Sequence, residues 1–122
     1  MALNGYVYVL TQIKTGKKYV GRTAKPKRRK ADHMQALHGG YHINKEMQSD
    51  FNKYHGDYSF EVVGYDGDSE RRGIWSLEKQ TMIRLKTYDP RYGYNAHDTA
   101  IVGWLNKCRM YLDATKEQEQ SA

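Results

Sequence analysis

The sequence has few of the features that staple a chain or anchor it in a membrane. Cys108 is the only cysteine among 122 residues, which excludes an intrachain disulfide and a cysteine-rich zinc site. No apolar run approaches the ~18 residues of a membrane span, and the N-terminal residues lack the pattern of a signal peptide. A chain of this length buries roughly two-thirds of its unfolded surface, so it can form a stable core without disulfides or bound metal ions. We therefore expect a soluble, cytoplasmic, single-domain protein.

Acidic residues are absent from residues 1–31, which carry nine Lys or Arg. The remaining 91 residues carry 11 basic and 14 acidic side chains, so the formal net charge of +6 comes from the first quarter of the chain. Clustered Lys and Arg gain affinity for a polyanion by releasing its counterions. The pattern favours a nucleic-acid-binding face, and the alternative is a solvated surface with a localisation-like basic run.

The first forty residues predict a hairpin followed by a helix. Residues 5–11 (GYVYVLT) and 18–22 (KYVGR) are rich in aromatic and β-branched residues, which favour strands, and residues 14–17 form the turn between them. Pro26 suits the first turn of a helix that we expect to run to about Leu37 and to stop at the glycines at 39 and 40.

The rest of the chain predicts helices around one further strand. Apolar residues at 43, 47, 51 and 54 predict a helix ended by Gly56, and residues 58–65 (YSFEVVGY) predict a strand. After a turn at 66–68, Ser69 is the expected N-cap of a helix over 70–86. Residues 89–95 are typical of a loop, apolar residues at 101, 105, 108 and 112 predict a last helix, and the polar residues 114–122 are expected to be disordered. This order predicts an α+β fold: a small three-stranded antiparallel sheet flanked by helices, plus a C-terminal helix.

Two aromatic segments of the predicted hairpin begin a series of motifs with regular spacing. Tyr6-Val7-Tyr8 and Tyr19-Val20-Gly21 are eleven residues apart from Tyr to Tyr, Arg29 follows Gly21 by eight residues, and His33 follows Arg29 by four. Residues 42–45 (HINK), residues 51–56 (FNKYHG), Glu78 and residues 94–95 (YN) come next in order. Over about residues 5–97 this series resembles the GIY-YIG nuclease family, and it is most similar to the catalytic domain of phage intron-encoded homing endonucleases. Tyr6 stands where the family usually has Gly, a minor departure because Tyr8 supplies the chemistry.

The resemblance implies a nuclease domain over residues 1–98, with residues 99–122 packed on it or extending it. It also implies one active site, built from Tyr8, Tyr19, Arg29, His33, His42 and Glu78. Glu78 would be the only protein ligand of one Mg²⁺ or Mn²⁺ ion, and Mg²⁺ prefers few carboxylates and keeps several waters. Arg29 would clamp the phosphate through its planar fork of donors, and on a helix it shares a face with His33.

For the other roles, the resemblance and the residue types leave alternatives. One of the two tyrosines, more often the first, would activate or orient the attacking water, and His33 or His42 would relay the proton or hold the phosphate. DNA contacts are expected at Arg22, Lys25, Lys27, Arg28, Lys30 and Asn95; the basic residues are equally typical of plain surface, and Asn95 equally suits bracing the site. Tyr6 is expected to pack, and His55 and His97 to lie on the surface or brace loops. His38 and His42 have the spacing of a zinc pair, but the glycines between them break the helix that such a pair needs.

The predicted function is therefore that of a small, metal-dependent DNA endonuclease of a phage or mobile element, acting in the cytoplasm of a bacterial or phage-infected cell. One active site cuts one strand, so the enzyme is a nickase, or it makes duplex breaks through two nicks, a reorientation or a dimer. The alternative is a nucleic-acid-binding protein that kept the scaffold and lost activity. Expected partners are double-stranded DNA and either a targeting protein or a second copy bound through Trp104, Leu105 and Leu112, with no membrane.

Overall fold

A computed structural model of the chain describes residues 5–66 and 76–121, with side chains described as far as residue 110. Three strands and four helices follow one another: β1 (Tyr6–Gln12), β2 (Lys18–Thr23), α1 (Pro26–Gly39), α2 (Lys45–Tyr54), β3 (Tyr58–Tyr65), α3 (Leu77–Leu85) and α4 (Thr99–Ser121). The strands form one antiparallel sheet in the order β2-β1-β3, so the strand from the start of the chain is central. The predicted α+β fold is confirmed.

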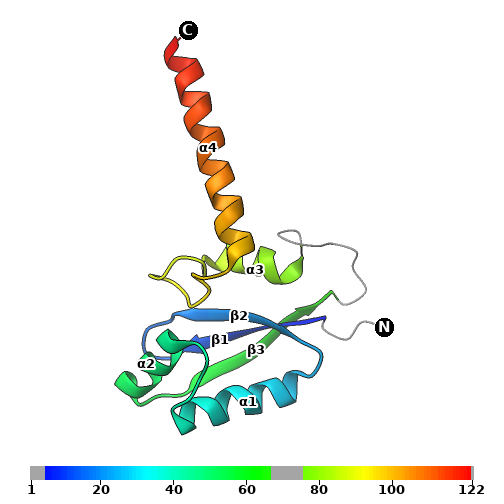
Figure 1. Ribbon diagram of the computed structural model, residues 1–122. Coiled ribbons are helices and arrows are strands. Elements are labelled where there is room, and N and C mark those ends of the chain that lie inside the picture. Colours follow the sequence, from blue (N-terminus) through cyan, green and yellow to red (C-terminus); the bar gives the residue numbers. More distant parts are fainter. Residues whose placement is uncertain (1–4, 67–75, 122) are drawn as a thin grey trace.

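The sheet separates two layers of helices, with α1 and α2 on one face and α3 and the start of α4 on the other (Figure 1). The alternation of β1 supplies both faces, because successive strand side chains point to opposite sides. Tyr8 and Leu10 pack with Leu37 and Met47 beneath the sheet. On the other face Val7, Val9 and Val20 pack with Met82 and Ile101.

The first two helices end in left-handed caps. Gly40, at φ 79°, follows α1 and confirms the predicted stop. Asn44 caps α2, and its Oδ1 accepts the backbone N–H of Met47 at 3.1 Å. The predicted stripe from Ile43 is wrong at its first member, because Ile43 lies before this cap and is 88% exposed. Gly56 is also not the cap, since His55 takes the left-handed conformation at φ 51°.

The last two helices differ from their predicted bounds. A helix over 70–86 is wrong in its described part, because Ser76 is extended and its Oγ accepts the N–H of Lys79 at 3.3 Å, which starts α3 at Leu77. The expected cap at Ser69 lies outside the described residues. The disorder expected from residue 114 is wrong as far as Ser121, because α4 continues through that stretch. Ala, Lys, Glu and Gln are strong helix formers, and polarity alone did not reveal this.

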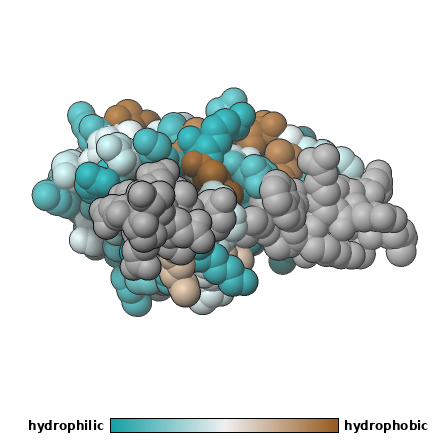
Figure 2. Space-filling model, turned by 90° about the horizontal axis from the view of Figure 1, so that it is seen from above, coloured by the Kyte–Doolittle hydropathy of each residue, from teal (hydrophilic) through white to brown (hydrophobic). Residues whose placement is uncertain are grey.

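Among the described side chains of α4, those that pack on the core lie near its start, and the helix then projects away from the sheet (Figure 1). Ile101 is fully buried and Leu105 half-buried against the upper core, whereas Met110 is 71% exposed. Seen from the side of α4, hydrophobic patches on the described surface are small and separated by hydrophilic residues (Figure 2). Within the described ranges, no helix combines the length and the hydropathy that crossing a membrane requires.

Candidate active site

The hairpin brings Tyr8 and Tyr19 to the same face of the sheet, with ring centroids 6.4 Å apart. Tyr8 is paired in register with Gly21, and Tyr19 with Leu10. A Cβ at position 21 would overlap Cζ and Oη of Tyr8, so the phenol lies over a glycine that leaves room for it. On its other side the Tyr8 ring stacks on Phe60 of β3, with centroids 4.8 Å apart.

The first helix directs two side chains, one turn apart, at the phenol oxygen of Tyr8. Arg29 Nε donates to this oxygen at 3.2 Å, and His33 Nε2 is hydrogen-bonded to it at 2.8 Å. The predicted shared face of Arg29 and His33 is therefore what joins them to Tyr8. His33 and Tyr8 are buried, 4% and 1% exposed, whereas Arg29 is half-buried and keeps access to solvent.

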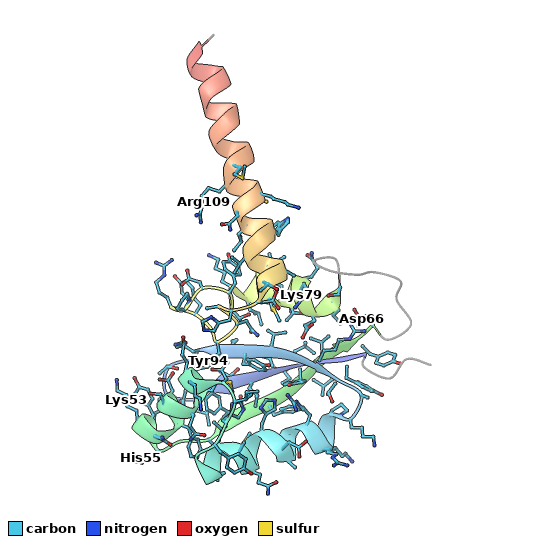
Figure 3. All side chains as sticks on the ribbon, viewed as in Figure 1. Lys53, His55, Asp66, Lys79, Tyr94 and Arg109 are labelled. Carbon is cyan, nitrogen blue, oxygen red and sulfur yellow. The ribbon has the colours of Figure 1, made fainter. Side chains whose placement is uncertain are left out.

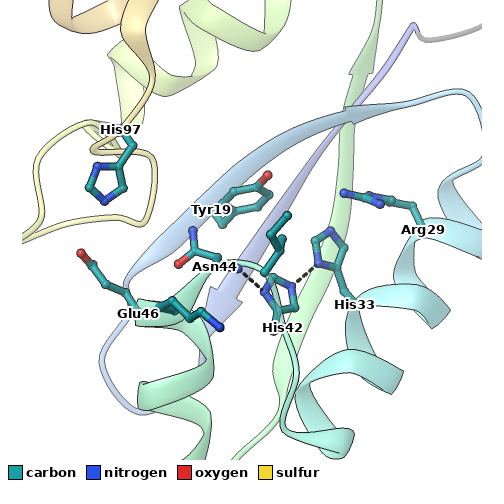
Figure 4. Close-up of a pocket in the computed structure, with 9 residues that line it drawn as sticks. Tyr19, Arg29, His33, His42, Asn44, Glu46 and His97 are labelled. Carbon is teal, nitrogen blue, oxygen red and sulfur yellow. Dashed lines mark hydrogen bonds between the residues drawn. The ribbon is translucent and has the colours of Figure 1, made fainter.

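The connection between α1 and α2 adds His42 to this group. His42 Nε2 lies 2.8 Å from His33 Nδ1, and the two rings are stacked with centroids 5.0 Å apart. The backbone N–H of Asn44 donates to His42 Nδ1 at 3.0 Å, as Figure 4 shows. The backbone N–H of His42 in turn donates to Gln48 Oε1 at 2.9 Å. The His42 ring is thus held at Nδ1 by a backbone amide and at Nε2 by His33, and the His42 backbone is held by Gln48.

A cavity of about 320 Å³ opens beside these groups (Figure 4). Its lining includes Tyr19, Arg29, His33, His42 and also Glu46 and His97. Two smaller hollows adjoin it, one beneath Tyr41 and one between Lys25 and Arg28. Arg29 lines all three, so this residue is shared by the cavity and both hollows.

Glu78 enters from the opposite layer, in the first turn of α3. The charge of its carboxylate raises the pKa of both Tyr8 and Tyr19, so it lies within electrostatic reach of both phenols. Burial raises the pKa of Glu78 itself, and the positive charges of Lys79 and Arg22 oppose this shift. Lys79 Nζ lies 3.7 Å from Glu78 Oε1, beyond a hydrogen bond, and pairs more closely with Asp98, the residue before α4. Figure 3 shows Lys79 where α3 lies close to the start of α4.

Burial dominates the other ionisable groups of the site. It raises the pKa of the Tyr8 phenol, against the lowering effect of Arg29, and raises that of Tyr19 to about 12. It lowers the pKa of His33 to about 3, with the charge of Arg29 acting in the same direction, and it also lowers that of His42. At neutral pH the site therefore holds neutral imidazoles, neutral phenols and a guanidinium cation.

Residues 92–95 cover the outer edge of β2. Tyr94 N–H donates to the Lys18 carbonyl at 2.9 Å, and the Asn95 amide both accepts from Val20 N–H at 2.8 Å and donates to the Val20 carbonyl at 3.1 Å. Asn95 is buried, which favours the bracing role over a DNA contact. Tyr94 lies in the lower core, where its hydroxyl donates to Asp50 at 2.6 Å.

The predicted DNA contacts surround this site unevenly. Lys25, Lys27, Arg28 and Lys30 are exposed around the start of α1, and two of them line the hollow next to Arg29. Arg22 is half-buried and ion-paired with Asp66 at 2.9 Å. His38 pairs with Asp57 instead of approaching His42, and His55 and His97 are exposed. Tyr6 packs on Tyr65, with ring centroids 4.7 Å apart.

Sequence reasoning missed Asn44 as a member of the site. Its backbone N–H holds His42, and its side-chain Nδ2 donates to the Tyr94 carbonyl at 3.0 Å. An Asn directly before a run of helical periodicity is the signal of an N-cap that was available. Asp98 was missed as well, because only the packing of the start of α4 against α3 brings it to Lys79, the neighbour of Glu78 in the sequence.

Comparison with known proteins gives a consistent result. Residues 4–95 match the GIY-YIG catalytic domain. The fold is similar to that of the catalytic domain of homing endonuclease I-TevI, with a TM-score of 0.61 and 20% identity over 75% of this chain and 95% of that one. A glutamate-to-alanine mutant of the catalytic domain of intron endonuclease I-TevI matches with a TM-score of 0.57 and 25% identity, over 79% of this chain and 96% of that one. No curated protein sequence matches the chain.

Proposed function

Because the chain belongs to the GIY-YIG nuclease family, we propose that it is a divalent-metal-dependent DNA endonuclease with a single active site, built around the cavity that Tyr19, Arg29, His33 and His42 line. The site would consist of Tyr8, Tyr19, Arg29, His33, His42 and Glu78. The likeness to an intron endonuclease supports a nicking or homing-type enzyme of a phage or mobile element, working in the cytoplasm of its host cell.

One observation carries the proposal: Arg29 joins the phenol of Tyr8 to three adjoining hollows. A guanidinium with access to solvent at such a junction offers several N–H donors to a phosphate, in the planar geometry that phosphate oxygens favour. The Tyr8 oxygen lies 3.2 Å from Arg29 Nε, so a water that this oxygen holds would lie close to a phosphate bound by Arg29.

The donor set of Glu78 fits one Mg²⁺ or Mn²⁺ ion. Nucleases of this family are generally dependent on a divalent metal. By the resemblance to the family, Glu78 would be the lone protein ligand; among the described residues, no group of three or more His, Cys, Asp or Glu is arranged to hold a metal. Mg²⁺ suits such a site because it keeps most of its waters, and a cation would offset the burial that raises the pKa of this carboxyl. When bound, the ion would stabilise negative charge on the phosphate and on the leaving oxygen.

The residues of the chain have separate tasks in this proposal. Arg29 holds the scissile phosphate and stabilises the charge on its oxygens in the transition state. Tyr8 orients a water and takes its proton, which requires the phenol to ionise against the raised pKa that burial gives it. Tyr19 lines the cavity and would contact the substrate there.

The exposed basic residues around the start of α1 supply affinity for the DNA backbone. Lys25 and Arg28 line the hollow that continues from Arg29, so a strand with its phosphate on Arg29 passes along them. Contacts of this kind are independent of base sequence and weaken with salt.

Conversion of supercoiled plasmid tests the function. We expect the wild-type protein to nick the plasmid with Mg²⁺ and to leave it intact with a chelator, and Glu78→Gln to bind DNA without cutting it. Linear product at early times would indicate paired cutting, by two copies or by reorientation of one. Binding without cleavage by the wild-type protein, with either Mg²⁺ or Mn²⁺, would contradict the proposal and favour a nucleic-acid-binding protein on the same scaffold.

A further inference from the structure

A chain of hydrogen bonds runs from a backbone amide into the site, and the amide gives the chain a direction. The Asn44 N–H donates to His42 Nδ1 at 3.0 Å. A backbone nitrogen has no lone pair to offer, so it can only donate. His42 Nδ1 must therefore be the unprotonated nitrogen, and a neutral His42 carries its proton on Nε2.

The same reasoning determines the tautomer of His33. His42 Nε2 lies 2.8 Å from His33 Nδ1, and two protonated nitrogens cannot meet at that distance. His42 Nε2–H therefore donates, His33 Nδ1 accepts, and the proton of a neutral His33 is on its Nε2. That Nε2–H donates to the Tyr8 oxygen at 2.8 Å, while Arg29 Nε–H donates to the same oxygen at 3.2 Å.

Both imidazoles meet the condition of neutrality that this reasoning needs. Burial and the charge of Arg29 lower the pKa of both histidines, that of His33 to about 3. Neither ring carries a second proton near neutral pH, so each has one donor and one acceptor.

We infer that the Asn44 amide fixes His42 and His33 as Nε2–H tautomers, and that the pair serves Tyr8 as a hydrogen-bond donor and not as an acceptor for its proton. The consequence for cleavage rests on the proposed function. Of the two tasks that the sequence left open for the histidines, the geometry excludes the proton relay, because no ring nitrogen with a free lone pair faces the phenol.

The proton of Tyr8 then leaves toward solvent. Ionisation breaks the O–H bond and yields a phenolate that accepts two hydrogen bonds, from His33 and Arg29. During cleavage the phenolate takes a proton from the attacking water, and the water oxygen bonds to phosphorus. The bond between phosphorus and the leaving oxygen breaks, and the leaving oxygen takes a proton from solvent. Hydrogen bonds to a charged oxygen are the stronger kind, so the donor pair favours the ionised form.

The groups that face Tyr8 come from every element packed against it. Arg29 and His33 reach it from α1, Tyr19 from β2, and Glu78 acts on it electrostatically from α3. Phe60 of β3 adds no ionisable group. Of these, Arg29 and His33 favour the phenolate, and Glu78 opposes it.

The tautomers can be read directly in the unmodified protein. Long-range ¹H–¹⁵N correlation NMR at pH 7 distinguishes protonated from unprotonated ring nitrogens, and His33→Gln and His42→Gln assign the signals. We expect unprotonated Nδ1 and protonated Nε2 in both rings. Exposed His55 is the control, and we expect its ring to show both tautomers. A proton on Nδ1 of either ring would overturn the inference, whether or not the protein cuts DNA.

Cleavage rates of two variants distinguish a hydrogen-bond donor from a proton-accepting base at position 33. A Gln amide offers an N–H near the place of Nε2 but cannot accept a proton, and Leu offers neither. We expect His33→Gln to cut at least about tenfold faster than His33→Leu. The pH at which Tyr8 ionisation limits the rate should rise by about one unit in His33→Leu, and by less in His33→Gln. Equal inactivity of both folded variants, beside an active wild type, would overturn the donor role. A wild type that cuts no DNA would contradict the proposed function alone, and the tautomer measurement would still decide this inference.

Discussion

At the scale of single residues, the site depends on a tyrosine that is held from three sides. Gly21 leaves room for the phenol, Phe60 stacks on its ring, and Arg29 and His33 bind its oxygen. The resemblance predicted that Tyr8, Arg29 and His33 lie together, and the structure brings them together because they lie on one hairpin and the helix after it. The space that Gly21 leaves for the phenol was not predicted.

Removal of the phenol oxygen tests the role of Tyr8. We expect Tyr8→Phe to lower the single-turnover cleavage rate by about 10²–10⁴-fold, the range for loss of a general base, and to flatten the pH–rate profile where Tyr8 ionises. Affinity for DNA should change little, because Arg29 remains. An unchanged rate would exclude Tyr8 from the chemistry.

Gly21→Ala tests the space beneath the phenol. The added Cβ would overlap Cζ and Oη of Tyr8, so the ring must shift, at a cost of about 1–3 kcal/mol in the free energy of unfolding. Cleavage should fall with it, because the phenol oxygen leaves Arg29. Gly103→Ala is the matched control, since a Cβ there meets no atom within 4 Å and only improves helix propensity. Urea unfolding and plasmid cleavage measure both variants, and equal behaviour would refute the steric argument.

At the scale of elements, the alternation of β1 determines which helices cover each face of the sheet. The sequence predicted this hairpin and the α1 helix well because their signals are local. The true start of α3 and the full length of α4 escaped prediction. Ser76 caps α3 within a stretch that also had helical periodicity, and the polar end of α4 had the composition of a disordered tail. The sequence also did not reveal that residues 92–95 cover the edge of β2, because this contact joins residues 75 positions apart.

Substitution of Asn95 tests whether residues 92–95 brace the edge of β2. Asn95→Ala leaves the N–H and the carbonyl of Val20 without their amide partner, and we expect the free energy of unfolding to fall by roughly 2 kcal/mol or more. Asn106→Ala, at an exposed position of α4, is the control. Should both substitutions cost the same, Asn95 would not brace β2, and the predicted DNA contact would become the better interpretation.

At the scale of the molecule, positive charge gathers around the start of α1. A triple variant, Lys27→Ala with Arg28→Ala and Lys30→Ala, should weaken binding to any duplex sequence. The slope of log Kd against log salt should fall by about 0.9 for each phosphate that the variant no longer neutralises. Fluorescence anisotropy across a salt series measures this. Lys107→Ala with Arg109→Ala on the projecting α4 helix is the control (Figure 3), and an equal effect there would place the DNA elsewhere.

Stability of the whole fold should depend on His33 at acid pH. An unfolded histidine binds its proton near pH 6.5, whereas burial lowers the pKa of His33 to about 3 in the fold. Between these values the unfolded chain binds more protons, so the contribution of His33 to the free energy of unfolding is complete above pH 6.5 and declines as the pH falls toward 3. Urea unfolding between pH 7 and 4 should show a shallower decline for His33→Gln, and parallel curves would argue against a neutral, buried His33.

The central claim is that Glu78 and the Tyr8–Arg29 group act on one phosphate from opposite layers of the fold. Paramagnetic broadening by Mn²⁺, measured by NMR with a duplex bound, tests it most directly. We predict that low Mn²⁺ broadens the ring signals of Tyr19 and His33 before those of His38, and that Glu78→Gln abolishes the effect. Broadening that spares Tyr19 and His33, or that persists unchanged in Glu78→Gln, would contradict a shared site.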